Sequence, residues 1–210
     1  MPIPKPTYIY RITHYSNVPW ILDHGLHCRT SPTQDPNFVN IGNRDLIDKR
    51  AMRIVGVPPG GVLNDYVPFY FCTHSVMLFN IHTGRVEGVN VKQEDVVYLV
   101  SSIEELQDRQ LAFAFTDRHA YVQGARYYND PVRLAALDWP LIHGRDFKRD
   151  PNDPGKLERR AAECLVHRHL PIEAVLHVVC KDVERENFLH EQVKLRHNST
   201  KVLRASQWYF

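Results

Sequence analysis

The sequence lacks a long hydrophobic run, because none of its apolar segments approaches the roughly 20 residues that a transmembrane helix needs. Its first ten residues, MPIPKPTYIY, also lack the apolar core of a secretory signal. We therefore expect a cytoplasmic protein with no membrane partner.

Paired cysteines and metal-binding motifs are missing too. The four cysteines (Cys28, Cys72, Cys164 and Cys180) are widely scattered and form no CxxC pair, which indicates free thiols in a reducing compartment. Twelve histidines are many for 210 residues, yet no HExxH or comparable ligand spacing occurs. The sequence thus predicts neither a disulfide framework nor a metal site.

The chain also lacks GxGxxG, Walker and GxSxG motifs, and its strands and helices do not alternate regularly. The missing GxGxxG motif and the irregular order of strands and helices disfavour a Rossmann domain. A length of 210 residues, with 43% hydrophobic and 24% charged residues, fits a single globular domain over residues 1–210. Because the net charge is only +2, any binding of nucleic acid must depend on local basic patches.

What is present is an irregular series of short strands and helices. Alternating or β-branched runs predict strands over 8–14, 96–102, 111–117, 171–180 and 200–210. Helical spacing and caps predict helices from Val18 to a stop at Gly25, and over 45–52, 102–110, 130–142 and 186–197. In the aromatic stretch after residue 65, Pro68 argues against an ordinary central strand. Together these elements predict an α+β domain with a mostly antiparallel core.

The most unusual segment is the loop 144–156, rich in basic residues, proline, glycine and aspartate, which leads into an amphipathic run containing Glu163. If residues 157–168 are a helix, Glu163 lies on its polar side as a solvated ion-pair residue of little energetic value. If ECLVH is instead a strand, Glu163 stands at its start and faces whatever cleft the sheet lines. Periodicity leaves both interpretations open.

Other candidates lie near the ends of predicted elements. Arg11 and His14 are in the first strand, where an ion pair and a structural hydrogen bond are the simpler interpretations. Arg50 or Arg53 could clamp a pyrophosphate, since a guanidinium matches phosphate oxygens with two hydrogen bonds, although unpaired surface arginines are common. Tyr70 could stack on a flat ring or belong to the core.

Several segments together, in this order along nearly the whole chain, resemble the DarT family of toxin–antitoxin ADP-ribosyltransferases, which modify thymidine in single-stranded DNA. The segments are YIYRITHYSNVPWILDHGL, NIGNRDLIDKRAMRIV, DYVPFYFCTHSVML followed by IHTG, FTDRHA, YYND with LDW, and DPNDPGKLERRAAECLVHRHLP. The resemblance implies an ADP-ribosyltransferase-like fold, in which a split, mostly antiparallel sheet surrounds an NAD cleft. It also implies NAD as co-substrate, single-stranded DNA as substrate and a macrodomain-type antitoxin as partner.

The resemblance also implies the residues of the site. It places the catalytic glutamate on Glu163, the catalytic arginine on Arg50, and a further catalytic histidine on His119. It implies an NAD-binding loop over about 28–53 and cofactor contacts from Arg11, His14, Asn40, Gly42, Asn43, Arg50 and Tyr70. It implies a substrate-recognition region over about 117–163 and DNA contacts from His74, Ser75, Met77, Arg118, Arg145, Lys148, Arg149, Lys156 and Arg159. Thr73-His74 and Arg118 depart from the family pattern, which often has Pro-Arg and glycine there, and both could alter base preference.

The chemistry agrees with this assignment. A carboxylate next to the nicotinamide ribose would stabilise the positive charge that develops as the glycosidic bond breaks. Arg50 could stabilise a thymine anion, or His119 could act as general base. The alternatives are a transferase of the same fold that acts on guanosine, RNA or protein, a hydrolase that uses Glu163 as base, and a non-catalytic nucleic-acid-binding module.

Overall fold

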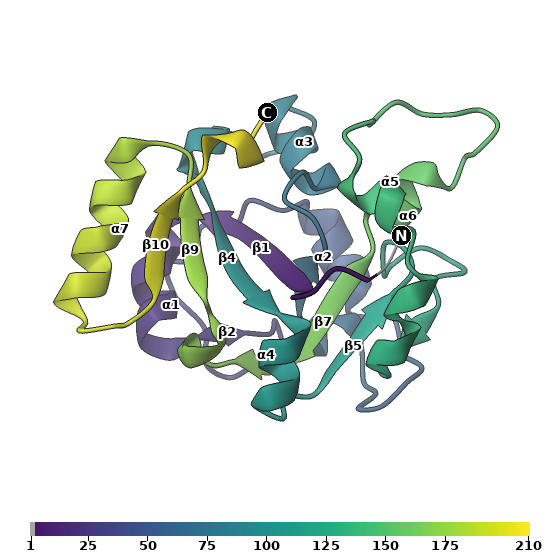
Figure 1. Cartoon of the computed structure of the whole chain (residues 1–210), viewed down its shortest axis with the longest axis horizontal. Coiled ribbons are helices and arrows are strands. Elements are labelled where there is room, and N and C mark those ends of the chain that lie inside the picture. Colours follow the sequence, from purple (N-terminus) through teal and green to yellow (C-terminus); the bar gives the residue numbers. More distant parts are fainter. Residues whose placement is uncertain (1–2) are drawn as a thin grey trace.

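The computed structural model describes residues 3–210 and is built on one large sheet (Figure 1). The strand order is β10-β9-β4-β1-β3-β7-β5-β6, and every neighbouring pair is antiparallel except β9 with β10. The bounds are β1 Tyr8–His14, β3 Tyr66–Tyr70, β4 Val96–Ser102, β5 Phe113–Thr116, β6 Tyr127–Tyr128, β7 Glu163–His167, β9 His177–Cys180 and β10 Lys201–Arg204. A separate two-stranded sheet joins β2 (Leu26–His27) to β8 (His169–Leu170).

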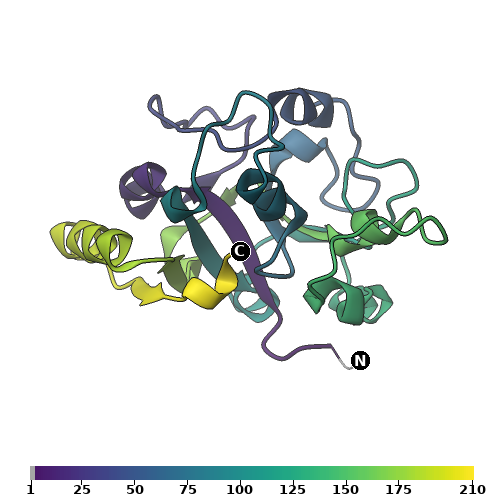
Figure 2. The same ribbon diagram turned by 90° about the horizontal axis from the view of Figure 1, so that it is seen from above.

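Within residues 3–210, seven short helices surround the sheet, and the largest lies along its β10 edge. Figures 1 and 2 show this helix, α7, at the end opposite to α5 and α6. The bounds are α1 Val18–His24, α2 Arg44–Arg50, α3 Val76–His82, α4 Ile103–Asp108, α5 Trp139–His143, α6 Lys156–Arg160 and α7 Val183–Leu195. In residues 3–210, no helix is both long and apolar enough to cross a membrane.

The sheet is nearly split between β1 and β3. Seven residue pairs join β1 to β4, and five join β3 to β7, whereas β1 and β3 share only the pair Tyr10 and Tyr70. The two halves of the sheet therefore separate beyond this pair. Glu163 pairs with Tyr70 across β7 and β3, so it lies directly at the opening.

The hydrophobic core is continuous on one face of the sheet and divided on the other. The continuous cluster joins Ile9, Leu99 and Val166 of the sheet to α1 and α7. On the opposite face, one cluster packs α3 on β1 and β4, and another packs residues 55–66 on β5 and β7. Side chains alternate along a strand, so Glu163 shares the divided face with Leu165.

Most of the local predictions are confirmed. The first strand ends at His14, and the first helix ends at Gly25, whose φ of 75° suits glycine. Ser102 caps α4 by accepting a hydrogen bond from the Glu105 N–H at 3.0 Å. The mostly antiparallel α+β architecture is also confirmed.

Four predictions about elements are wrong. The strand expected over 171–180 begins only at His177, because residues 172–174 form a 3-10 turn. Pro68 lies in β3, a central strand, where the missing N–H is tolerated beside a nearly absent β1–β3 ladder. The helix expected over 130–142 is divided into a 3-10 turn over 131–136 and α5. The strand expected over 200–210 ends at Arg204, because the chain then turns so that Tyr209 packs on the sheet.

The structure also decides between the two interpretations of Glu163. A short helix, α6, ends at Arg160, and Glu163 is the first residue of strand β7. The strand is held between β3 and β5, and its first four residues are buried. The helical interpretation of 157–168 is therefore wrong.

Candidate active site

Glu163 is a buried carboxylate with fixed partners. It is 2% exposed, and its backbone N–H donates to Thr116 Oγ1 at 3.1 Å. Arg50 Nη1 donates to Glu163 Oε2 at 3.0 Å and to Oε1 at 3.3 Å, and the Ala120 N–H donates to Oε1 at 2.8 Å. Because a carboxylate has about four acceptor positions, Oε2 keeps the capacity to accept one more hydrogen bond.

The surroundings keep this carboxylate charged. Burial by itself opposes ionisation, but Arg50, His119 and the Ala120 N–H outweigh it and lower the pKa of Glu163 below its ordinary value. His119 Nδ1 lies 3.8 Å from Glu163 Oε1 and accepts the Tyr121 N–H at 3.2 Å. That hydrogen bond assigns the proton of the neutral imidazole to Nε2. Glu163 is thus an anion at neutral pH.

One arginine binds this carboxylate, and a second lies near the first. Arg50, the last residue of α2, is 8% exposed, and its Nη2 is buried without a hydrogen-bond partner in residues 3–210. Arg11 reaches across the opening of the sheet to donate to the Pro68 carbonyl at 3.0 Å, and its Nε is likewise unpartnered within the described chain. Burial and the neighbouring Arg50 lower the pKa of Arg11 to about 10. Unsatisfied cationic donors beside one anion favour a ligand that carries phosphates, which fits NAD.

Tyr70 and His14 border the same opening. Burial and the nearby Glu163 raise the pKa of Tyr70 above its ordinary value, so the phenol stays neutral and can donate a hydrogen bond. His14 is half-buried at the end of β1, where its Nδ1 lies 2.7 Å from Ser16 Oγ and burial lowers its pKa. Both side chains therefore present polar groups that remain uncharged at neutral pH.

The segment predicted to bind NAD is organised by local hydrogen bonds. Asn17 donates to the Val39 carbonyl and accepts the Val39 N–H, at 2.9 and 2.8 Å. Asn40 and Gly42 close a tight turn, in which the Gly42 N–H donates to Asn40 Oδ1 at 3.1 Å. Asn43 caps α2 by accepting the Leu46 N–H at 2.9 Å. These contacts fix the start of α2 and thereby position Arg50 at its end.

The residues predicted to contact DNA fall into three environments. His74 and Ser75 are buried, Ser75 Oγ caps α3 by accepting the Leu78 N–H, and Met77 packs against the cluster beneath α3. Arg118, Lys156 and Arg159 are paired with Asp117, Asp146 and Asp153, and Arg145 donates to the Gln207 carbonyl. Lys148 and Arg149 are exposed, and neither has an ion-pair partner in residues 3–210. Only these two loop cations are therefore free of a protein acceptor in the described chain.

The basic loop is anchored at Phe147. Its ring stacks on Phe79 with centroids 4.6 Å apart, and the Arg160 guanidinium lies 4.1 Å above it. Arg160 is 1% exposed and also donates to the carbonyls of Leu141 and His74. The loop is thus attached to α3 and to the residues just before Glu163.

Sequence reasoning missed three groups that build the site. Thr116 holds the Glu163 backbone, the Ala120 N–H binds the carboxylate, and Asn17 ties the 28–43 loop to α1. Thr116 lies at the end of the predicted strand 111–117, where polar residues commonly belong to a site. A backbone N–H carries no sequence signal, and Asn17 precedes α1 without making a side-chain cap hydrogen bond.

An antiparallel sheet that opens at a buried glutamate held by Arg50 places this protein in the class of ADP-ribosyltransferases. The model of the DarT family, described as "ssDNA thymidine ADP-ribosyltransferase, DarT", matches residues 10–210. The chain therefore belongs to the DarT family.

Its similarity to individual proteins covers almost the whole chain. It is 44% identical over 207 residues to a DNA ADP-ribosyl transferase of Escherichia coli O127:H6, covering 99% of this chain and 95% of that protein. The solved structure of Thermus sp. 2.9 DarT in complex with ADP-ribosylated ssDNA superposes with a TM-score of 0.88 at 33% identity, covering 99% and 98% of the two chains. The structure of the same protein in complex with NAD+ superposes with a TM-score of 0.85 at 34% identity, covering 99% of both chains. The predicted family and fold are confirmed.

No group of three or more His, Cys, Asp or Glu side chains that could hold a metal ion occurs within residues 3–210. The residue roles within the site, and the limits of the NAD-binding and substrate-recognition segments, stay predictions.

Proposed function

We propose that this chain transfers ADP-ribose from NAD to a thymidine base in single-stranded DNA, with Glu163 and Arg50 at the reacting centre. The observation that carries the proposal is the buried, ionised Glu163 held between Arg50 and the Ala120 N–H, next to unsatisfied arginine donors. NAD supplies the ADP-ribosyl group and releases nicotinamide. Family membership and the likeness to Thermus DarT bound to NAD+ support this assignment.

Glu163 is suited to act on the nicotinamide ribose. Its free acceptor position on Oε2 can accept a hydrogen bond from a ribose hydroxyl, which orients the sugar. Its fixed negative charge then stabilises the positive charge that develops on the sugar as the glycosidic bond breaks. Because Arg50 and Ala120 already hold the carboxylate, it needs little reorganisation during the reaction.

Arg50 and His119 are the candidates for the acceptor side. The ring nitrogen of thymine must lose a proton to become a good nucleophile, and the unpartnered Nη2 of Arg50 can stabilise the resulting anion. An arginine scarcely deprotonates, so Arg50 acts electrostatically. His119 carries its proton on Nε2 in this geometry, so accepting a proton there requires the other tautomer. We therefore assign anion stabilisation to Arg50 and keep His119 as the alternative proton acceptor.

The substrate must be single-stranded, because the reactive ring nitrogen of thymine is engaged in a duplex. Lys148 and Arg149, on the loop anchored by Phe147, offer exposed charge to a phosphate backbone. The likeness to Thermus DarT in complex with ADP-ribosylated ssDNA supports this substrate. The same chemistry suggests that the enzyme acts in the cytoplasm, where DNA is present, and that a macrodomain-type antitoxin reverses the modification.

A non-catalytic nucleic-acid-binding module is disfavoured, since binding at the surface has no use for a buried carboxylate between cations. The decisive experiment incubates the chain with NAD and separate pools of thymidine-containing single strands, thymidine-free single strands, duplex, RNA and protein. Mass spectrometry should detect one ADP-ribosyl adduct on thymidine in the first pool alone. An adduct on guanosine, RNA or protein instead would refute the substrate assignment.

A further inference from the structure

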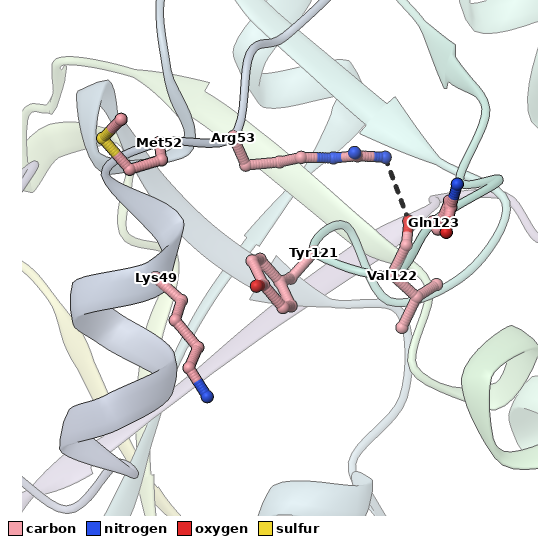
Figure 3. A pocket seen from close by; sticks show the side chains of 6 residues that line it. All are labelled: Lys49, Met52, Arg53, Tyr121, Val122 and Gln123. Atoms are coloured by element: carbon pink, nitrogen blue, oxygen red, sulfur yellow. Dashed lines mark hydrogen bonds between the residues drawn. The ribbon is translucent and has the colours of Figure 1, made fainter.

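A second feature is a cavity of about 520 Å³, whose lining side chains are drawn in Figure 3. This volume lies within the roughly 300–1,000 Å³ typical of ligand pockets. Two segments form it, the end of α2 with the residues after it, and the turn after Ala120. The lining residues are Lys49, Met52, Arg53, Tyr121, Val122 and Gln123.

The cavity is lined by chain neighbours of the two groups that hold Glu163, and not by those groups themselves. Arg50 lies between two of the lining residues in sequence, and Ala120 directly precedes a third, yet neither Arg50 nor Glu163 lines the cavity. The two walls are joined by a hydrogen bond from Arg53 Nη2 to the Val122 carbonyl at 3.1 Å, drawn in Figure 3. A molecule in this cavity is therefore next to the group that reacts, rather than being that group.

The lining has the chemistry of a nucleotide site. Two side chains are cationic, no lining residue is acidic, and Tyr121 presents an aromatic ring. Met52 adds a polarisable apolar surface and is 85% exposed, which is unusual for methionine. A cation beside an aromatic and an apolar side chain suits one phosphate and one base, since single-stranded nucleic acids bind by backbone charge and base stacking.

We propose that this cavity receives the nucleotide adjacent to the target thymidine in the acceptor strand, with its base on Tyr121 and Met52 and its phosphate next to Lys49. The proposal rests on the proposed function, since it names the second contact made by the same DNA substrate. It makes Tyr121 and Lys49 determinants of substrate binding rather than catalytic residues. A preference for the base beside the target would then arise at this cavity.

The test uses a single-stranded oligonucleotide with one thymidine, and versions that carry an abasic site directly 5′ or directly 3′ of it. The dissociation constant is measured by fluorescence anisotropy without NAD, and transfer by mass spectrometry with NAD. The variants are Tyr121→Ala, Tyr121→Phe and Lys49→Gln. Lys201→Gln, on the exposed edge strand β10, is the matched control.

For the wild type, one of the two abasic positions should weaken binding roughly 5- to 100-fold, the range expected for losing one stacked base. Tyr121→Ala should weaken binding of the intact strand to a similar extent and should abolish the effect of the abasic site, whereas Tyr121→Phe should behave like the wild type. Lys49→Gln should reduce the slope of log binding constant against log salt by about 0.7. Lys201→Gln should change none of these values.

Two results would overturn the proposal. In one, binding is insensitive to both abasic sites and to Tyr121→Ala and Lys49→Gln. In the other, Tyr121→Ala weakens NAD binding but not DNA binding, which would assign the cavity to the dinucleotide. If binding depends on Tyr121 as expected but no thymidine is ever modified, the cavity assignment stands and the proposed function fails.

Discussion

Replacing Glu163 by glutamine tests the central ion pair, because it removes one charge while keeping the shape. The amide oxygen can still accept from Arg50 and from the Ala120 N–H, so the hydrogen bonds at Oε1 survive. What is lost is the charge attraction between Arg50 Nη1 and Glu163 Oε2, which lie 3.0 Å apart. Before the cost of desolvation is subtracted, this attraction is about 5 kcal/mol at an effective dielectric constant of about 20.

The expected losses follow from that charge. Breaking a buried ion pair completely costs about 3–5 kcal/mol of stability. Because the hydrogen bonds at Oε1 survive, we expect Glu163→Gln to lose an amount at or below the lower end of this range. A loss of about 3 kcal/mol corresponds to a decrease in Tm of roughly 6–12 °C in a chain of this size. Because the carboxylate stabilises the transition state electrostatically, kcat should fall at least 10²- to 10³-fold, while NAD affinity changes only a few-fold.

The assay combines thermal unfolding with nicotinamide release in the presence of a thymidine-containing single strand. Glu158→Gln is the control, since Glu158 lies five residues earlier on α6 and its side chain has no ion-pair partner in residues 3–210. Its unfolding free energy should change by less than about 0.5 kcal/mol, with full activity. If Glu163→Gln retains more than about a tenth of wild-type kcat, the electrostatic role of this carboxylate in the transition state is refuted.

Three further predictions concern the same centre. Arg50→Lys keeps the charge but loses the planar fork, so kcat should fall about 10-fold or more while NAD affinity falls less; equal losses would make Arg50 a cofactor clamp. Since the pKa of folded Glu163 lies below the ordinary 4.5, its stabilising contribution is complete above that pH and lost as the pH falls through the folded pKa. The difference in unfolding free energy between wild type and Glu163→Gln should thus stay constant from pH 5.5 to 8 and shrink below about 4.5; a difference that grows on acidification would contradict the ion pair. Thr116→Val removes the acceptor of the Glu163 N–H and should cost about 1–3 kcal/mol in denaturant unfolding, whereas an unchanged midpoint would show that this hydrogen bond does not hold β7.

Much of the secondary structure could be predicted because its signals are local. The β-branched run 96–102 forms the buried strand β4, and Ser102 caps the helix that follows. The errors occur where a distant segment decides the outcome. Pro68 is acceptable in a central strand only because the sheet opens beside it, and that opening is a property of β1 and β3 together.

For the site, the residues themselves pointed to Arg11, Arg50 and Glu163 as candidates, and the family resemblance assigned their roles. The contacts among them could not be predicted, since Arg50 and Glu163 are 113 positions apart. The loop cations show the same limit, because the pairing of Lys156 with Asp146 and of Arg159 with Asp153 could not be predicted from the sequence.

The sequence by itself determined the family, through its resemblance to known members. It also determined the α+β class and most strands and helices, since periodicity, caps and turn residues act over a few positions. Only the tertiary structure decided that Glu163 begins a strand, because β3 and β5 supply the hydrogen bonds that a helix would have made internally. Only the tertiary structure brings the end of α2 together with the turn after Ala120. These two segments hold the Glu163 carboxylate and also form the cavity.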